Sequence, residues 1–236
     1  MTGPEHTPIA LVGSGEYLPS MLDIERALIA GRSPRYVQLA TAAAPEGEQS
    51  LDRWHTLGRA QAERLGVEQV VIDVRTREDA DREDLADLIV DAGLIYFSGG
   101  NPAFLAETLR ETLVWAAILA AHQKGAALAG CSAGAMALTS WAPRMRDLLG
   151  DPPPALDLLP HLRVIPHFDR MAAWLPDTMR NAFMRHPPDV TLVGIDEETA
   201  LVGGPHEWVV QGRQSVWVLG EGKRVECKSG NTLVTP

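Results

Sequence analysis

The chain has 236 residues, of which 45% are hydrophobic and 22% charged, with a formal net charge of -10. Its lysines and arginines are scattered, which excludes a general affinity for nucleic acid or anionic lipid, because clustered cations hold those partners. Two cysteines are too few for a stapled secreted domain, and residues 1–6 do not resemble the start of a signal peptide, so we expect a cytoplasmic protein. The longest apolar run, residues 113–121, is far shorter than the ~20 residues that span a bilayer.

Short apolar runs alternate with amphipathic stretches in the first half of the chain. The runs predict strands at 9–12, 36–39, 70–72, 94–97 and 126–129, and the amphipathic stretches predict helices that include 51–65 and 85–92. This alternation is typical of a mostly parallel sheet with helices on both faces. Since domains of up to ~250 residues commonly share one core, we predict a single α/β domain over residues 1–236.

The second half of the chain is less regular. Prolines between residues 141 and 162 exclude a long regular element there, and we interpret this segment as a flap or covering loop near the active site. A strand at 162–165, a helix near 172–185, a strand at 190–193 and several short strands from 201 to 234 follow. In these last strands, Trp208 and Trp217 either pair with a second subunit or complete the sheet.

Three glycine-bearing turns follow predicted strands: Gly-Ser-Gly-Glu at 13–16, Ser-Gly-Gly-Asn at 98–101 and Gly-Cys-Ser-Ala-Gly at 130–134. Ligands of such sheets bind beyond the carboxyl ends of the strands, so these turns converge where a site is expected. A sharp strand-to-helix turn that exposes a nucleophile needs small residues two positions to either side of it. Gly130 and Gly134 meet this need around Ser132, whereas centring the turn on Cys131 leaves only alanines as its flanks. The spacing favours Ser132 as the nucleophile, with Cys131 as its rival.

A serine nucleophile needs a general base, and histidine suits that role near neutral pH. Of the seven histidines, His167 stands just past a predicted strand and before a predicted helix, where its side chain can face the crevice. An acid should orient the imidazole. The candidates are the Asp-Glu-Glu triplet at 196–198, which follows a predicted strand, and Asp147 in the proline-rich segment.

An oxyanion site is commonly built from two backbone N–H groups, one from the residue after the nucleophile and one from a neighbouring loop. Ala133 is the first candidate. Gly100 is the second, in the Gly-Gly-Asn turn that also contains Asn101, because a residue without a side chain lets the backbone approach the substrate.

Four strings in this order resemble peptidase family S51, which contains peptidase E and cyanophycinase: the turns at 98–101 and 130–135, Pro-His-Phe at 166–168, and the segment 194–200. The resemblance runs from the first strand to about Val202. It implies a class I glutamine amidotransferase-like (flavodoxin-like) α/β fold, with three layers and additional C-terminal strands. It also implies that Ser132 rather than Cys131 attacks, with His167 as base. The segment around Glu197 matches the cyanophycinase-like enzymes, so a Ser-His-Glu triad is favoured over one that uses Asp147.

The resemblance further implies a serine peptidase acting on short peptides, by preference an aspartyl dipeptidase. The alternatives are a β-aspartyl peptide hydrolase and a non-catalytic binding module. An aspartyl group needs a cation to hold its carboxylate, and Arg170 and Arg180 are candidates. No cofactor is expected. A metal site at His161, His167 and Asp169 is disfavoured because no motif has tight ligand spacing. A homodimer is the usual expectation for such folds.

Overall fold

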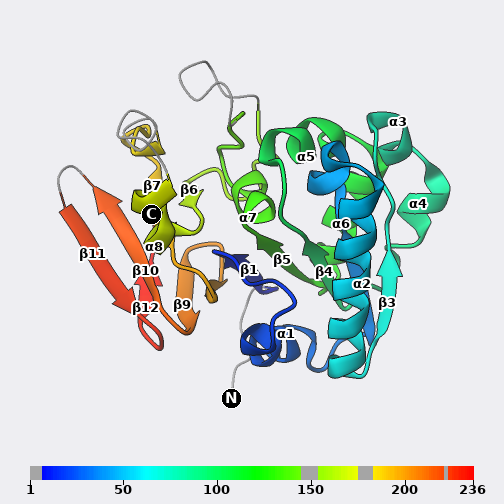
Figure 1. Cartoon of the computed structure of the whole chain (residues 1–236), viewed down its shortest axis with the longest axis horizontal. Coiled ribbons are helices and arrows are strands. Elements are labelled where there is room, and N and C mark those ends of the chain that lie inside the picture. The colour runs from blue at the N-terminus through cyan, green and yellow to red at the C-terminus, as the bar shows by residue number, and fades with distance from the viewer. Residues whose placement is uncertain (1–6, 145–153, 175–182, 221–222) are drawn as a thin grey trace.

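The strand predicted at residues 9–12 lies inside the larger of two sheets in the computed structural model, which describes residues 7–144, 154–174, 183–220 and 223–236. In this described part the sheet has eight strands, in the order β12-β9-β8-β1-β5-β4-β2-β3. Figure 1 shows β1, β5 and β4 next to one another near the middle of the molecule. Along that order the strands are β12 (Thr232–Val234), β9 (Glu207–Gly212), β8 (Thr199–Gly203), β1 (Ile9–Val12), β5 (Ala127–Cys131), β4 (Leu94–Phe97), β2 (Arg35–Leu39) and β3 (Glu68–Val71).

The five strands from the first half of the chain, β1 to β5, are parallel to one another. Strands β8, β9 and β12 extend the sheet beyond β1 in antiparallel pairing. A large, mostly parallel sheet is therefore confirmed. Because β1, β5 and β4 are adjacent and parallel, the three glycine-bearing turns that follow them lie at one edge.

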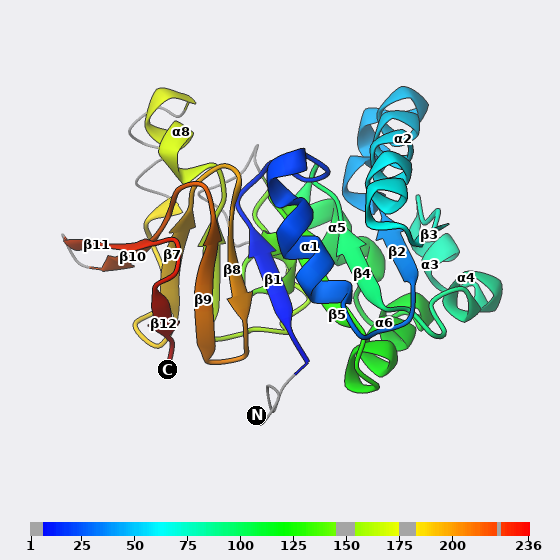
Figure 2. The ribbon, with the colours of Figure 1, turned by 90° about the horizontal axis from the view of Figure 1, so that it is seen from below.

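The remaining strands form a second sheet, which the sequence did not predict as a separate unit. Its order is β11-β10-β7-β6, with β11 (Lys223–Lys228), β10 (Ser215–Gly220), β7 (Thr191–Ile195) and β6 (Leu162–Ile165). Strands β6 and β7 are parallel, so their carboxyl ends also share an edge. Figure 2 shows this sheet at the end of the molecule opposite β3.

Helices cover both faces of the larger sheet. On one face, α1 (Leu22–Ile29) and α2 (Glu48–Leu65) pack against alternate side chains of the parallel strands, among them Tyr36 and Tyr96. On the other face, Leu39, Phe97 and Leu128 of the same strands pack with the remaining early helices. These helices are α3 (Arg77–Ala80), α4 (Glu83–Asp87), α5 (Pro102–Leu109), α6 (Leu113–Gln123) and α7 (Ala133–Leu138).

Two of the predicted helices differ most in extent from those in the structure. The helix predicted over 85–92 ends at Asp87, because the following residues close short turns and Asp91 adopts a positive φ of 61°. The helix predicted near 172–185 begins earlier, as α8 (Phe168–Trp174), and residues 175–182 lie outside the described part. The centre of the proline-rich segment, with Asp147, also lies outside the described residues, so the flap remains a prediction.

The two sheets share one apolar core. Val164, Val193 and Val216 of the second sheet belong to the same cluster of buried side chains as Leu11 and Leu128 of the first. Trp208 is buried in β9, where its indole N–H donates to Thr235 Oγ1 at 3.2 Å. It therefore packs within its own chain.

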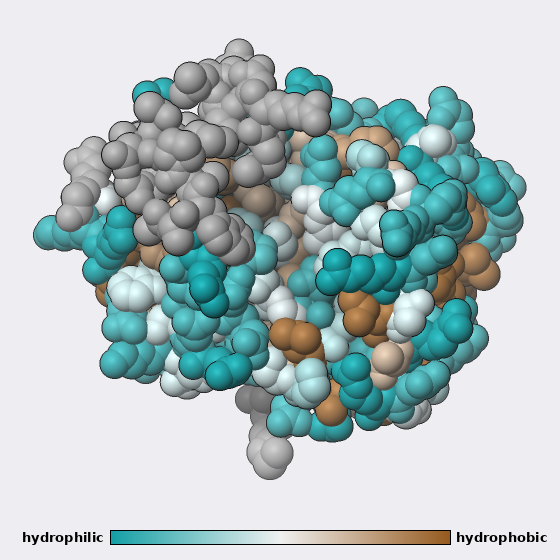
Figure 3. Space-filling model, in the orientation of Figure 1, coloured by the Kyte–Doolittle hydropathy of each residue, from teal (hydrophilic) through white to brown (hydrophobic). Residues whose placement is uncertain are grey.

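The face of the molecule seen in Figure 3 is mainly polar where its residues are described. Figure 3 shows a predominantly hydrophilic face on which hydrophobic residues form small groups. Among the described helices, none combines the length and the apolar character needed to cross a membrane.

Candidate active site

Ser132 occupies the sharp turn between β5 and α7. Its backbone has φ 49° and ψ −106°, a strained conformation for a residue with a side chain. A Cβ on Gly130 would lie 2.6 Å from the carbonyl carbon of Gly134, and a Cβ on Gly134 would lie 2.6 Å from the carbonyl oxygen of Phe97. The glycines at these two positions are thus a steric requirement of the turn that raises the Ser132 hydroxyl above the sheet.

His167 and Glu197 follow strands of the second sheet and form a chain of contacts that begins at Ser132. His167 Nε2 lies 3.2 Å from Ser132 Oγ, and His167 Nδ1 lies 3.0 Å from Glu197 Oε1. His167 follows β6 and Glu197 follows β7, so the parallel pairing of these strands brings both side chains to one edge. This continuous hydroxyl-imidazole-carboxylate arrangement fits proton transfer from Ser132 to His167.

The three acids of the 196–198 triplet have different environments. Asp196 is buried and accepts hydrogen bonds from the Trp217 indole at 3.1 Å and the Ser215 backbone at 3.2 Å. Burial raises the pKa of Asp196 above its ordinary value. Glu198 forms an ion pair with Arg213 at 3.0 Å. Only Glu197 contacts His167 among these three acids.

Residues on both sides hold Glu197 in place. Its backbone N–H donates to Asp169 Oδ1 at 2.9 Å, and the Gln214 side chain donates to its carbonyl oxygen at 3.0 Å. Arg170 Nε lies 3.5 Å from Glu197 Oε2. The guanidinium of Arg170, which the sequence marked for a substrate carboxylate, therefore lies beside the acid of the site. The other candidate, Arg180, lies outside the described residues.

The turn at 98–101 lies beside Ser132, since a Cβ added at Gly99 would lie 3.6 Å from Ser132 Cβ. Gly100 has φ +137°, and a Cβ there would lie 2.4 Å from the carbonyl oxygen of Ala42, so only glycine fits. Ala133 begins α7, where an N–H has no partner within the helix. Asn101 caps α5 by accepting from the Phe104 N–H at 3.0 Å and is not among the residues that line the pocket described below. Its role in substrate binding remains a prediction.

Glu16 is a residue of the site to which the sequence gave no role. Its Oε1 accepts from the Gly99 N–H at 3.1 Å, and its Oε2 accepts from the Cys131 thiol at 2.8 Å. The carboxylate thus ties the turn after β4 to the end of β5. Its place in a glycine-bearing turn after a buried strand was the feature of the sequence that pointed to a role for Glu16. The sequence could not identify the groups that its carboxylate contacts.

Cys131, the rival nucleophile, is fully buried. Burial, and then the neighbouring Glu16 carboxylate, raise the pKa of the Cys131 thiol well above its ordinary value. The thiol therefore stays protonated near neutral pH. Ser132, and not Cys131, is among the described residues that line the pocket at this site.

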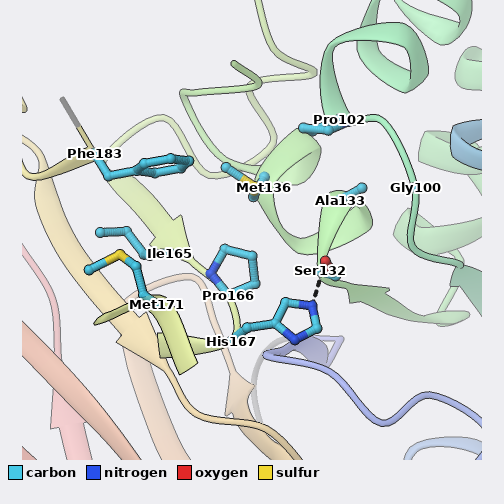
Figure 4. A pocket seen from close by; sticks show the side chains of 10 residues that line it. All are labelled: Gly100, Pro102, Ser132, Ala133, Met136, Ile165, Pro166, His167, Met171 and Phe183. Atoms are coloured by element: carbon cyan, nitrogen blue, oxygen red, sulfur yellow. Dashed lines mark hydrogen bonds between the residues drawn. The ribbon is translucent and has the colours of Figure 1, made fainter. Parts of the chain in front are cut away.

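A pocket with a volume of about 180 Å³ opens beside the Ser132 hydroxyl and His167 (Figure 4). Gly100 and Ala133 also line it, as expected for residues of an oxyanion site. The rest of its described wall is apolar and consists of Pro102, Met136, Ile165, Pro166, Met171 and Phe183. Apart from Pro166, which belongs to the Pro-His-Phe string, the sequence did not single out these residues, because an apolar pocket wall and a core have the same residue pattern.

Other histidines of the described chain have different partners. The ring nitrogens of His122, His161, His186 and His206 contact backbone carbonyl oxygens. Within the described ranges, no group of three or more His, Cys, Asp or Glu residues is arranged to hold a metal ion.

Comparison with known proteins identifies the family. The sequence profile of Peptidase family S51 matches residues 9–207. This chain belongs to peptidase family S51. A crystal structure of a peptidase from an acI-B1 Actinobacterium shares 40% identity with it, over 97% of each chain, and superposes with a TM-score of 0.90.

A similar fold is present in a protein of Listeria monocytogenes EGD-e assigned as a peptidase E. Its 1.5 Å crystal structure is 17% identical, covers 88% of this chain and 99% of its own, and has a TM-score of 0.64. This second likeness concerns the fold alone. No curated protein sequence matches the chain. The S51 resemblance drawn from the four ordered strings is confirmed, and with it a peptidase.

Proposed function

We propose that this S51 peptidase is a serine peptidase in which Ser132 is the nucleophile, His167 the general base and Glu197 the acid that orients the imidazole. The observation that carries the proposal is the pair of contacts made by the His167 ring, 3.2 Å to Ser132 Oγ and 3.0 Å to Glu197 Oε1. The fold is the class I glutamine amidotransferase-like α/β fold, with serine at the position of the nucleophilic cysteine.

In the proposed mechanism, Ser132 Oγ attacks the carbonyl carbon of the scissile amide while its proton passes to His167 Nε2. Glu197 stabilises the imidazolium that forms. The N–H groups of Gly100 and Ala133 stabilise the negative oxygen of the tetrahedral intermediate. Collapse of the intermediate breaks the C–N bond, and the leaving amine takes the proton from His167. Water, deprotonated by His167, then hydrolyses the Ser132 ester and releases the acid.

The proposed substrates are short peptides. The narrower proposal, by resemblance to peptidase E, is a peptide with an N-terminal aspartyl residue. The cation that would hold the aspartyl carboxylate must then come from residues other than those of the described pocket wall. The two cysteines are both unpaired, which supports action in the reducing cytoplasm.

The test is hydrolysis of Asp-Leu and of aspartyl anilides by the unaltered protein and by Ser132→Ala. We expect the substitution to lower kcat by at least about 10³-fold, because the nucleophile of an acyl-transfer triad acts as a unit with its base. Labelling of Ser132 by a fluorophosphonate, located by peptide mass spectrometry, is the substrate-independent readout. Equal turnover by both proteins, or no labelling of the folded protein, would contradict the proposal and favour a non-catalytic binding module.

A further inference from the structure

The pocket beside Ser132 has an apolar wall that plays no part in the proposed reaction. Apart from Ser132, His167 and the backbone of Gly100 and Ala133, its described lining is apolar, with no lysine or arginine. A charged side chain placed there would lose its hydration without gaining a partner of opposite charge from this wall. An apolar side chain would instead exchange water for hydrocarbon contacts.

The wall is the surface of a packed cluster. Met136, Ile165, Met171 and Phe183 belong to one group of buried side chains and are each at most 6% exposed. Phe183 is held edge-on against Trp141, with their ring centroids 5.1 Å apart. The pocket is therefore built and supported by neighbouring side chains, which favours binding without extensive rearrangement.

The position of the pocket gives its role. Figure 4 shows the Ser132 hydroxyl and the His167 ring at one end, with Phe183 and Met171 farther from the reacting atoms. A volume of about 180 Å³ corresponds to roughly six water molecules at ~30 Å³ each, enough for a medium-sized side chain. Because the scissile carbonyl must lie at the Ser132 end of the pocket, a substrate side chain that fills the pocket belongs to a residue directly adjoining the scissile bond.

We infer that this pocket is the specificity pocket of the peptidase and that it accepts an apolar side chain, such as that of leucine or phenylalanine, from a residue adjoining the scissile bond. The inference rests on the proposed serine peptidase activity. It holds for the residue on the acyl side or for that on the leaving side, since both adjoin the reacting carbonyl. An aspartyl peptide that also carries an apolar residue is compatible with it.

The experiment measures kcat/KM for two dipeptide series, X-Ala and Asp-X, with X as leucine, phenylalanine, serine, lysine or aspartate; the Asp-X series keeps the proposed N-terminal aspartyl residue while it varies the leaving side. We expect leucine or phenylalanine to exceed serine and lysine by at least about 10-fold in one series, since burial of a few methylenes is worth factors of this size. The series that responds identifies the side of the scissile bond. A preference for a charged or small polar X in both series would overturn the inference.

Substitution of the wall provides a second test. Met171→Lys brings a cation to the pocket and should lower the ratio of kcat/KM for X leucine to that for X aspartate by at least about 10-fold in the responding series. Met184→Lys is the matched control, because Met184 packs on the same cluster but does not line the pocket. Equal ratios for the two variants would also overturn the inference. If Met171→Lys does not fold, the substrate series on the unaltered protein still decide.

Fluorophosphonate labelling of Ser132 separates this inference from the proposed function. Labelling with no preference for apolar X rejects the apolar pocket and leaves the serine peptidase intact. Absence of both labelling and turnover rejects the serine peptidase, and the inference with it.

Discussion

At the residue scale, the 196–198 triplet shows that neighbouring acids in the sequence can have unrelated roles. Their side chains leave the chain in different directions, so Asp196 joins the second sheet, Glu198 pairs with Arg213, and Glu197 reaches His167. The chemistry of the proposed triad therefore depends on one carboxylate out of three.

Glu197→Gln tests this choice. The amide keeps the shape of the side chain but cannot stabilise a protonated imidazole as a carboxylate does, so we expect kcat/KM to fall by about 10²- to 10⁴-fold. Glu198→Gln, one residue along, should stay within a few-fold of the unaltered protein. Steady-state kinetics on the preferred dipeptide provide the measurement. Comparable losses in the two variants would show that the effect is structural and not specific to the proposed triad.

At the element scale, the turn between β5 and α7 combines a strained Ser132 with two glycines packed against backbone. The strain is held in place by the strand on one side and the helix on the other, since Ser132 N donates to Val12 O at 2.9 Å and Met136 N donates to Ser132 O at 3.0 Å.

Gly134→Ala should lower the free energy of unfolding by about 1–3 kcal/mol, because the new methyl group overlaps the carbonyl oxygen of Phe97. It should also lower kcat, since the turn positions Ser132. Gly220→Ala is the control, because a Cβ added at Gly220 would have no neighbouring atom within 4 Å. The backbone φ of Gly220, like that of Gly134, is not positive. We expect the control to change stability by less than about 0.5 kcal/mol in urea denaturation. A Gly134 variant as stable as this control would contradict the steric argument.

At the scale of the whole molecule, the site lies where the chain passes from one sheet to the other. The 196–198 triplet connects β7 of the second sheet with β8 of the first, and Glu198 N donates to Ser14 O at 3.1 Å. Gly13 allows this close approach, because a Cβ there would lie 2.2 Å from the carbonyl oxygen of Asp196. The relative position of the sheets thus fixes the distance between Ser132 and its partners.

The free energy of unfolding should depend on pH through Glu25 of α1. Its carboxyl group is only 2% exposed and accepts a hydrogen bond from the Tyr36 hydroxyl at 2.9 Å. Burial raises the pKa of Glu25 from 4.5 to about 7. Between these pH values the unfolded chain releases a proton that the folded chain keeps, so this group makes stability fall as pH rises. The upper bound for the full loss is about 3.5 kcal/mol, at about 1.4 kcal/mol per pKa unit.

Glu25→Gln should remove that contribution. Relative to the unaltered protein, the variant should gain up to about 3 kcal/mol on going from pH 4.5 to pH 8, measured by urea denaturation at both values. Glu63→Gln, an exposed position on α2, is the control and should show no such gain. A Glu25 variant whose stability relative to the unaltered protein is the same at both pH values would rule out this origin of pH dependence.

The sequence by itself determined the strands of the parallel sheet and the turn around Ser132. Both depend on local rules, since a buried strand needs a continuous apolar run and a sharp turn needs glycines at fixed spacing. The family also followed from short strings in order, which the profile match over residues 9–207 confirms.

Only the tertiary structure decided which acid of the 196–198 triplet contacts His167, where the late strands form a second sheet, and that the described wall beside Ser132 is apolar. Ser132 and His167 are 35 residues apart, and His167 and Glu197 are 30 apart. No local pattern encodes which of several acids crosses such a separation. An apolar residue likewise has the same appearance in the sequence whether it fills a core or lines a pocket, because the difference lies in whether another element of the fold covers it.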